Sequence, residues 1–262
     1  MLVTRLLVSL QVPTPIATRG PSGWPALRTA ATAALVVTVA LGAVSNVLFL
    51  GAFQFRRDWF DDPSLMVTGG AESAAFLRWA SITDLFSYYL PTAVVALALG
   101  VALRPHGPVL ARTSMMAGLA YVLAGAIGAA ALATAGPMLL HEYEQPGADR
   151  AAIAISFAVL IDVVFRAIWQ LLNGVLLGVW WFGIARLTRA DQPRFARLSA
   201  VLTALAWIGA ACNVVGFGLA RDATLGVVFL LWAAWSIWLA RLLWRRRPPF
   251  DCPDDSSRAT GM

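Results

Sequence analysis

The stretch from Ala151 to Leu187 constrains the fold more than any other part of this chain. It is apolar almost throughout. As one helix it would be about 55 Å long at roughly 1.5 Å per residue, whereas a bilayer core is about 30 Å thick. A helix of this length spans a membrane and protrudes, or bends, on the side where it begins.

The composition predicts an integral membrane protein. Hydrophobic residues make up 59% of the chain and charged residues 13%, whereas a soluble domain is about a quarter charged. Every basic residue is Arg, which with abundant Ala, Gly, Val and Trp suggests a GC-rich bacterial genome. The arginines lie in short loops between apolar stretches, so the positive-inside effect explains the high isoelectric point better than nucleic acid does. We expect membrane lipids as partners and no nucleic acid, and a homo- or hetero-oligomer stays open.

The apolar stretches predict an all-α, polytopic bundle of six transmembrane helices whose fourth helix is the longest. Small residues at helical spacing in the third span indicate close backbone approach, which favours a place at the centre of the bundle. A flexible cytoplasmic lead (1–27) precedes the transmembrane domain (28–247), and a disordered cytoplasmic tail (248–262) follows it. The predicted spans are about 28–53, 79–103, 113–140, 151–187, 198–220 and 223–244.

Six spans place both termini on one side of the membrane, and the arginines indicate which side. Most of them lie in the two tails and in the turns after the second and fourth spans, so these parts should be cytoplasmic. We therefore expect a multi-pass protein of the inner (cytoplasmic) membrane. The apolar start of the fourth helix needs a partner outside the bilayer, and we expect residues 54–78 to form this cap. The apolar side chains available are Phe53, Phe55, Trp59, Phe60, Leu65 and Met66.

The fourth helix also carries the densest polar series, since Asp162, Arg166, Gln170 and Asn173 are four, four and three residues apart. In an α-helix this spacing forms one stripe. Asp84 and Arg166 each precede a turn arginine by twenty residues, about 30 Å of helix, which puts both near the outer rim. If the helices converge there, an outward-facing vestibule results. The candidate ligand-binding residues are Asn46, Asp84, Asp162, Arg166, Gln170 and Asn173.

Arg166 is expected to form an ion pair, either with Asp162 one turn away or with Asp84 across the bundle. The same polar residues have a structural interpretation: Asn and Gln join neighbouring helices by hydrogen bonds, and rim-level charges reach headgroups and water. Tryptophans near the ends of spans, including Trp180, Trp181 and Trp244, fit aromatic belts at the membrane interface.

No catalytic or metal-binding signature is visible. His106 and His141 lie in turns on opposite sides, so they cannot share a metal. The sequence contains no G-x-S-x-G, H-E-x-x-H, P-loop or dinucleotide motif, and Cys212 and Cys252 suggest no paired role. We therefore expect no enzyme activity, no cofactor and no metal.

The segments WQLLNGVLLGVWWFGIARL (169–187) and WAAWSIWLARLLWRR (232–246) resemble small uncharacterised bacterial multi-pass membrane proteins with domains of unknown function. The resemblance covers roughly the second to sixth spans. It implies six helices and supplies no activity, cofactor or site.

Three functions stay open at this stage. The first is binding of a small amphiphile or lipid headgroup in the vestibule, with Arg166 meeting an anionic group. The second is a structural or accessory membrane subunit without a ligand. The third, a transporter subunit, is less favoured because the inner halves of the spans carry few polar residues. The size of the cavity among the candidate residues distinguishes the three functions.

Overall fold

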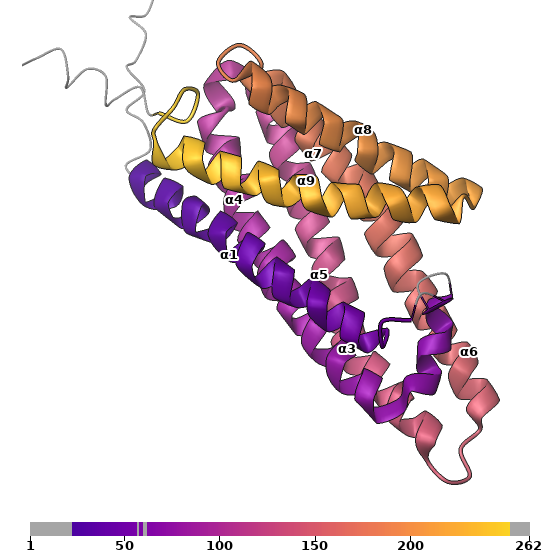
Figure 1. Cartoon of the computed structure of the whole chain (residues 1–262). Coiled ribbons are helices and arrows are strands. Elements are labelled where there is room, and N and C mark those ends of the chain that lie inside the picture. Colours follow the sequence, from indigo (N-terminus) through magenta and orange to yellow (C-terminus); the bar gives the residue numbers. More distant parts are fainter. Residues whose placement is uncertain (1–22, 57, 60–61, 252–262) are drawn as a thin grey trace, which may run out of the picture.

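The computed structural model describes residues 23–56, 58–59 and 62–251, and every regular element in these ranges is helical (Figure 1). Six helices are long and apolar enough to cross a membrane. The elements are α1 (Trp24–Ala52), η1 (Pro63–Gly69), α3 (Gly70–Asp84), η2 (Leu85–Tyr89), α4 (Leu90–Ala102), η3 (Arg104–His106), α5 (Pro108–Glu144), α6 (Arg150–Ile161), η4 (Asp162–Leu172), α7 (Asn173–Thr188), α8 (Pro193–Val215) and α9 (Gly218–Trp244).

The six-span, all-helical prediction is confirmed, and the fourth span, Arg150–Thr188, is the longest at 39 residues. Two spans contain π-helical segments, η2 in the second and η4 in the fourth. A π-helix bonds residue i to i+5, is rare, and often marks a functional site. Neither segment was expected from the sequence.

Several predicted boundaries differ from the structure. The second span begins at Leu65 rather than at residue 79, so part of the expected cap loop is helix. The fifth ends at Val215 rather than at residue 220, because Gly216 adopts a left-handed conformation (φ 79°) that stops the helix. Most of the expected lead and tail lie outside the described residues. Phe250, within the expected tail, is buried against Phe195 with ring centroids 6.5 Å apart.

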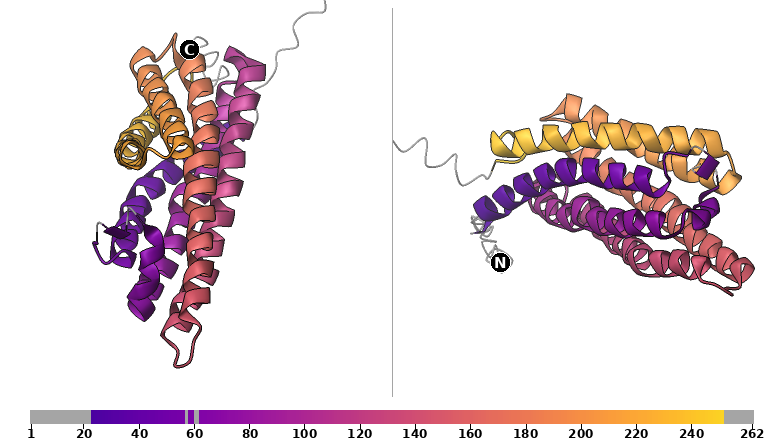
Figure 2. Two further views of the ribbon diagram at one scale, coloured as in Figure 1. Left: turned by 90° about the vertical axis from the view of Figure 1, so that its right-hand side faces the viewer. Right: turned by 60° about the horizontal axis from the view of Figure 1, so that its bottom comes forward.

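The six spans form a closed ring in which each span contacts the next along the chain, and α1 contacts α9 to complete it. In this ring α5 packs against the second and the fourth spans along much of its length (Figure 2). Gly125 shows why small residues are needed there: a Cβ at this position would collide with the Tyr89 ring.

The main core of the ring is aromatic. Trp181 contacts Trp232 at 5.3 Å between ring centroids, and Trp180 contacts Trp235 at 5.5 Å. Trp180 and Trp181 are buried, so their assignment to a membrane-interface belt was wrong. Trp244 is exposed, as such a belt requires. The sequence did not distinguish these sites, because buried and interfacial tryptophans both occur near the ends of spans.

A second apolar cluster surrounds the protruding start of the fourth span, which with the end of α5 extends past α8 and α9 (Figure 1, Figure 2). Phe157 and Ile161 of α6 are buried there with Trp59 and Met66. The connection between α1 and α3 therefore covers this helix. Phe53 also contributes, whereas Phe55 and Leu65 are exposed and Phe60 lies outside the described residues.

Outside the spans, Arg56 fixes the connection between α1 and α3. Its guanidinium lies 2.6 Å from Asp58 Oδ2 and 4.9 Å from the Trp59 ring centroid. The hydrogen bond from Arg56 lowers the pKa of the Asp58 carboxyl. This arrangement places Trp59 over the second cluster.

Replacing Trp59 with Ala should destabilise this cluster, because Trp59 is 2% exposed and removing a buried Trp costs about 3–5 kcal/mol. We expect the backbone amides of residues 150–161 to exchange hydrogen faster in this variant than in the wild type, measured in detergent. The matched control is Phe55→Ala, since Phe55 is 72% exposed. Equal exchange rates in the two variants would show that the connection does not cover α6.

Candidate functional site

Asp84, the last residue of α3, is a buried carboxyl held by hydroxyl groups. The Ser45 hydroxyl of α1 lies 3.2 Å from Asp84 Oδ1 and 3.2 Å from the Ala80 carbonyl oxygen. The Tyr89 hydroxyl lies near the Asp84 carboxyl. No ion pair to Asp84 is present within the described part of the chain. Asp84 therefore joins the first and second spans through hydrogen bonds.

Asn46 belongs to the same region. Its Nδ2 donates a hydrogen bond of 3.2 Å to the Tyr88 hydroxyl. The Tyr88 ring contacts Phe229 and Trp232 of α9, at 5.6 and 5.2 Å between centroids. The Asn46–Tyr88 pair thus links α1, η2 and α9 where the ring of helices closes.

Asp162 and Arg166 lie elsewhere, on an exposed face of η4. Arg166 Nε is 3.1 Å from Asp162 Oδ1, so of the two predicted ion pairs the one within the helix forms. Both side chains are about half exposed. The Arg166 carbonyl oxygen accepts a hydrogen bond of 2.8 Å from Asn213 of α8, which ties η4 to its neighbour.

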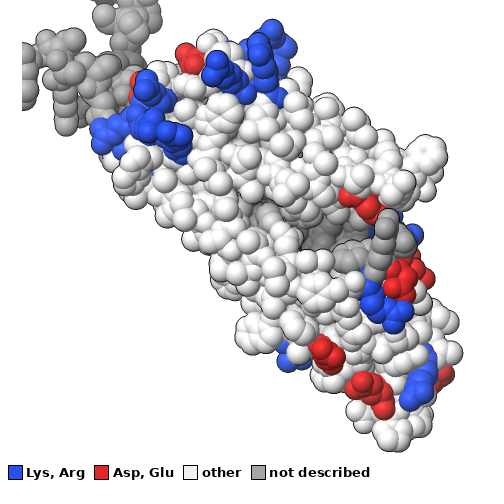
Figure 3. All heavy atoms as spheres, in the orientation of Figure 1, with Lys and Arg blue, Asp and Glu red and all other residues white. Residues whose placement is uncertain are grey.

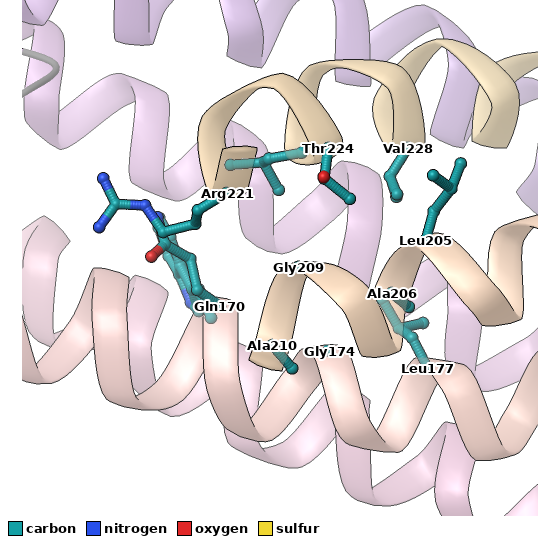
Figure 4. Close-up of a pocket in the computed structure, with 12 residues that line it drawn as sticks. Gln170, Gly174, Leu177, Leu205, Ala206, Gly209, Ala210, Arg221, Thr224 and Val228 are labelled. Carbon is teal, nitrogen blue, oxygen red and sulfur yellow. The ribbon is translucent and has the colours of Figure 1, made fainter. Parts of the chain in front are cut away.

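Gln170 lines a cavity of about 50 Å³ enclosed by the fourth span, α8 and α9. Figure 4 shows Gln170 and Arg221 at one end of this cavity, with Val228 and Leu205 at the other. Gln170 Oε1 is buried and has no hydrogen-bond partner among the described residues. Arg221 Nε bonds Asp222 Oδ1 at 2.7 Å, so its charge is paired.

Asn173, 2% exposed, begins α7 about one turn after Gln170. Its Oδ1 likewise has no hydrogen-bond partner in the described part of the chain. The polar series of the fourth helix thus runs from exposed Asp162 and Arg166 to buried Asn173.

The six candidate residues therefore occupy separate environments rather than one wide vestibule. Asn46 and Asp84 lie between the first and second spans, Asp162 and Arg166 are exposed, and Gln170 faces the small cavity. These residues do not converge, because Asn46 and Asp84 bond between the first two spans, whereas Gln170 lies beside α8 and α9.

Residues that the sequence analysis did not select complete these environments. Ser45 and the tyrosines contact Asp84 or Asn46, and Arg221 lines the cavity. Trp169 connects two of the regions: its ring contacts Phe49 of α1 at 5.8 Å, and it also lines the cavity. Arg221 could have been suspected, because Arg221 and Asp222 are the only charged residues between the fifth and sixth apolar stretches.

Among the described residues, no group of three or more His, Cys, Asp or Glu side chains could hold a metal ion. His106 lies 3.4 Å from Asp191 and joins η3 to the turn between α7 and α8.

Replacing Asp84 with Ala should lower the free energy of unfolding by about 1–3 kcal/mol, because the buried hydrogen bond from Ser45 that joins the first two spans would be lost. Asp84→Asn keeps an acceptor oxygen and should cost less. Thermal unfolding in detergent compares the two variants. The control is Asp162→Ala. It removes the exposed Asp162–Arg166 ion pair and should change the free energy of unfolding by no more than about 1 kcal/mol. Equal losses for Asp84→Ala and Asp162→Ala would mean that the Asp84 hydrogen bonds do not hold the first two spans together.

The comparisons with known proteins identify the family of the chain. The sequence pattern of DUF4386, a domain of unknown function, matches residues 30–245, which contain all or most of each of the six spans. No curated protein and no solved structure matches the chain. Because the match covers most of the chain, this multi-pass membrane protein belongs to the DUF4386 family.

Proposed function

We propose that this protein binds the polar head of a small amphiphile in the cavity lined by Gln170 and Arg221. The observation that carries the proposal is Gln170, which lines that cavity and whose buried Oε1 has no hydrogen-bond partner among the described residues. A buried acceptor without a partner costs about 1–3 kcal/mol. A ligand that donates a hydrogen bond to it recovers this cost.

The cavity defines the chemistry of the ligand. Its volume of about 50 Å³ is far below the roughly 300–1,000 Å³ that is usual for small-molecule sites, so we expect only a small head group to enter it. The acceptor requires a donor, and the Arg221–Asp222 pair carries no net charge. A small neutral donor such as a hydroxyl fits better than the anionic group expected from the sequence.

The surface of the molecule offers a route by which the apolar chain of the ligand could approach the cavity. Figure 3 shows the surface hollowed between α9 and α1, where the two helices diverge (Figure 1). Trp169, which contacts Phe49, lies between α1 and the cavity. An amphiphile entering from the outer half of the bilayer would keep its chain in this apolar hollow and place its head beyond Trp169.

Thermal unfolding of the full chain in detergent, with decanol and with its methyl ether, tests the proposal. The two share an alkyl chain, but only the alcohol donates a hydrogen bond. We expect decanol to stabilise the wild type more than the ether does. In Gln170→Leu this difference should vanish, because one hydrogen bond is worth about 1 kcal/mol or roughly fivefold in affinity.

The Gln170→Leu protein should also be as stable as wild type, or more so, without additives, since it removes an unsatisfied acceptor at similar volume. Gln145→Leu, in the exposed turn between α5 and α6, is the control and should keep the preference for decanol. Equal responses to alcohol and ether in the wild type, or a preference that persists in Gln170→Leu, would overturn the binding function.

A structural or accessory subunit without a ligand is the second candidate. The pairwise hydrogen bonds of Asn46 with Tyr88 and of Ser45 with Asp84 favour it. Under this function, decanol has no preferential effect on the wild type, so the same experiment separates the two. Transport has less support, because the buried hydroxyls Ser114, Thr188 and Thr203 all bond to backbone carbonyls. We also propose that the protein is not an enzyme.

We further propose that the protein lies in the inner membrane of a bacterium with both termini in the cytoplasm. Arginines gather at the end where α9 finishes and where α7 meets α8, whereas basic and acidic side chains mix at the opposite end (Figure 3). The side richer in arginine is retained in the cytoplasm.

Reporter fusions test this orientation. A fluorescent protein fused after residue 262 should fluoresce, and alkaline phosphatase at the same place should be inactive. Alkaline phosphatase inserted after Pro146, in the turn between α5 and α6, should be active. The reverse pattern would place the arginine-rich end outside.

A further inference from the structure

A groove of about 550 Å³ lies at the arginine-rich end, on the face of α9 next to the turn between α7 and α8. It is more than ten times larger than the Gln170 cavity and lies near the opposite end of α9. The sequence analysis did not single it out. The lining residues used below are Gln192, Ile237, Trp238, Arg241, Arg245 and Arg247.

The basic wall of the groove is held in place by the chain that follows α9. Gln192 Nε2 donates a hydrogen bond of 2.8 Å to the Pro248 carbonyl oxygen. The Arg247 backbone N–H bonds the Leu242 carbonyl oxygen at 3.1 Å, and Phe250 is buried against Phe195. The turn that carries Arg245 and Arg247 is therefore anchored to α8 before any ligand arrives.

The groove is strongly positive. No carboxylate lies within ion-pair distance of Arg241, Arg245 or Arg247 in the described part of the chain. The C-terminus of α9 contributes only about half a negative charge. The positive charge of the three guanidinium groups is much larger than this negative charge. The paired N–H groups of a guanidinium also match phosphate oxygens in geometry.

The other wall is apolar and continues toward the bilayer. Ile237 is 58% exposed on the same face of α9. Trp238 is half-buried and lines the groove between the apolar wall and the arginines. Tryptophan at this level is typical of the interface between acyl chains and headgroups. Toward the end of α9, the lining of the groove changes from apolar to aromatic to cationic. This order matches a phospholipid lying along α9.

We propose that this groove is a binding site for an anionic phospholipid, with the phosphate on Arg241, Arg245 and Arg247 and an acyl chain along Ile237. The volume fits the usual range of small-molecule sites, about 300–1,000 Å³. Basic pockets at the ends of transmembrane helices bind such headgroups. The inference is independent of the Gln170 cavity and of the function proposed for it.

Native mass spectrometry of the full chain in detergent, titrated with phosphatidylglycerol, tests the site. Phosphatidylcholine with the same acyl chains and soluble glycerol phosphate are the comparison ligands. Wild type should bind phosphatidylglycerol at least about tenfold more tightly than phosphatidylcholine, because each arginine adds about 1 kcal/mol for an anionic lipid. Glycerol phosphate should not compete with it.

The variant Arg241→Gln, Arg245→Gln, Arg247→Gln should lose this preference. The matched control is Arg186→Gln, Arg189→Gln, Arg194→Gln, which removes the same charge from exposed positions at the same end and should keep it. Equal loss in both variants would show a general charge effect and overturn the site. Competition by glycerol phosphate would make it a site for soluble anions, and no preference in the wild type would also overturn the proposal.

Discussion

The fold depends on the aromatic contact between the fourth and sixth spans. Within a bilayer, apolar surface gains little by leaving lipid, so helices associate through close packing and hydrogen bonds. Trp180 and Trp181 of α7 meet Trp232 and Trp235 of α9, and Trp235 Nε1 is held by the Ser199 hydroxyl of α8 at 2.9 Å. Tyr88 extends these contacts to the second span. The aromatic core thereby joins spans that are far apart in sequence and allows α1 to close the ring against α9.

The π-helical segments are the second determinant, because they redirect side chains and alter backbone hydrogen bonding. A backbone carbonyl buried in the membrane needs a donor. Asn213 supplies one to Arg166 in η4, and Trp169 Nε1 bonds the Gly125 carbonyl oxygen of α5 at 3.3 Å. These side-chain donors hold η4 between α5 and α8. In the same segment Gln170 lines the cavity, whereas the Arg166 side chain is about half exposed.

The two ends of the molecule differ in chemistry. The Gln170 cavity is small and carries a paired charge, which suits a neutral polar head. The groove at the end of α9 is larger and holds three arginines without carboxylate partners in the described part of the chain, which suits a phosphate. Both sites open on α9, and both combine a polar end with an apolar wall. A protein that senses or organises lipids would use such sites in both halves of a bilayer.

The sequence by itself determined the membrane architecture: six apolar spans, a long fourth helix and a third helix rich in small residues. These properties follow from hydropathy and local spacing, which act within one helix. Only the tertiary structure decided that Trp180 and Trp181 form the core, that Asn46 bonds Tyr88, and that Arg221 joins Gln170 at a cavity. Those contacts depend on which helices are neighbours and on the π-helical turn of η4. In an apolar segment many faces are chemically alike, so only the packing of the whole ring selects the face that turns inward.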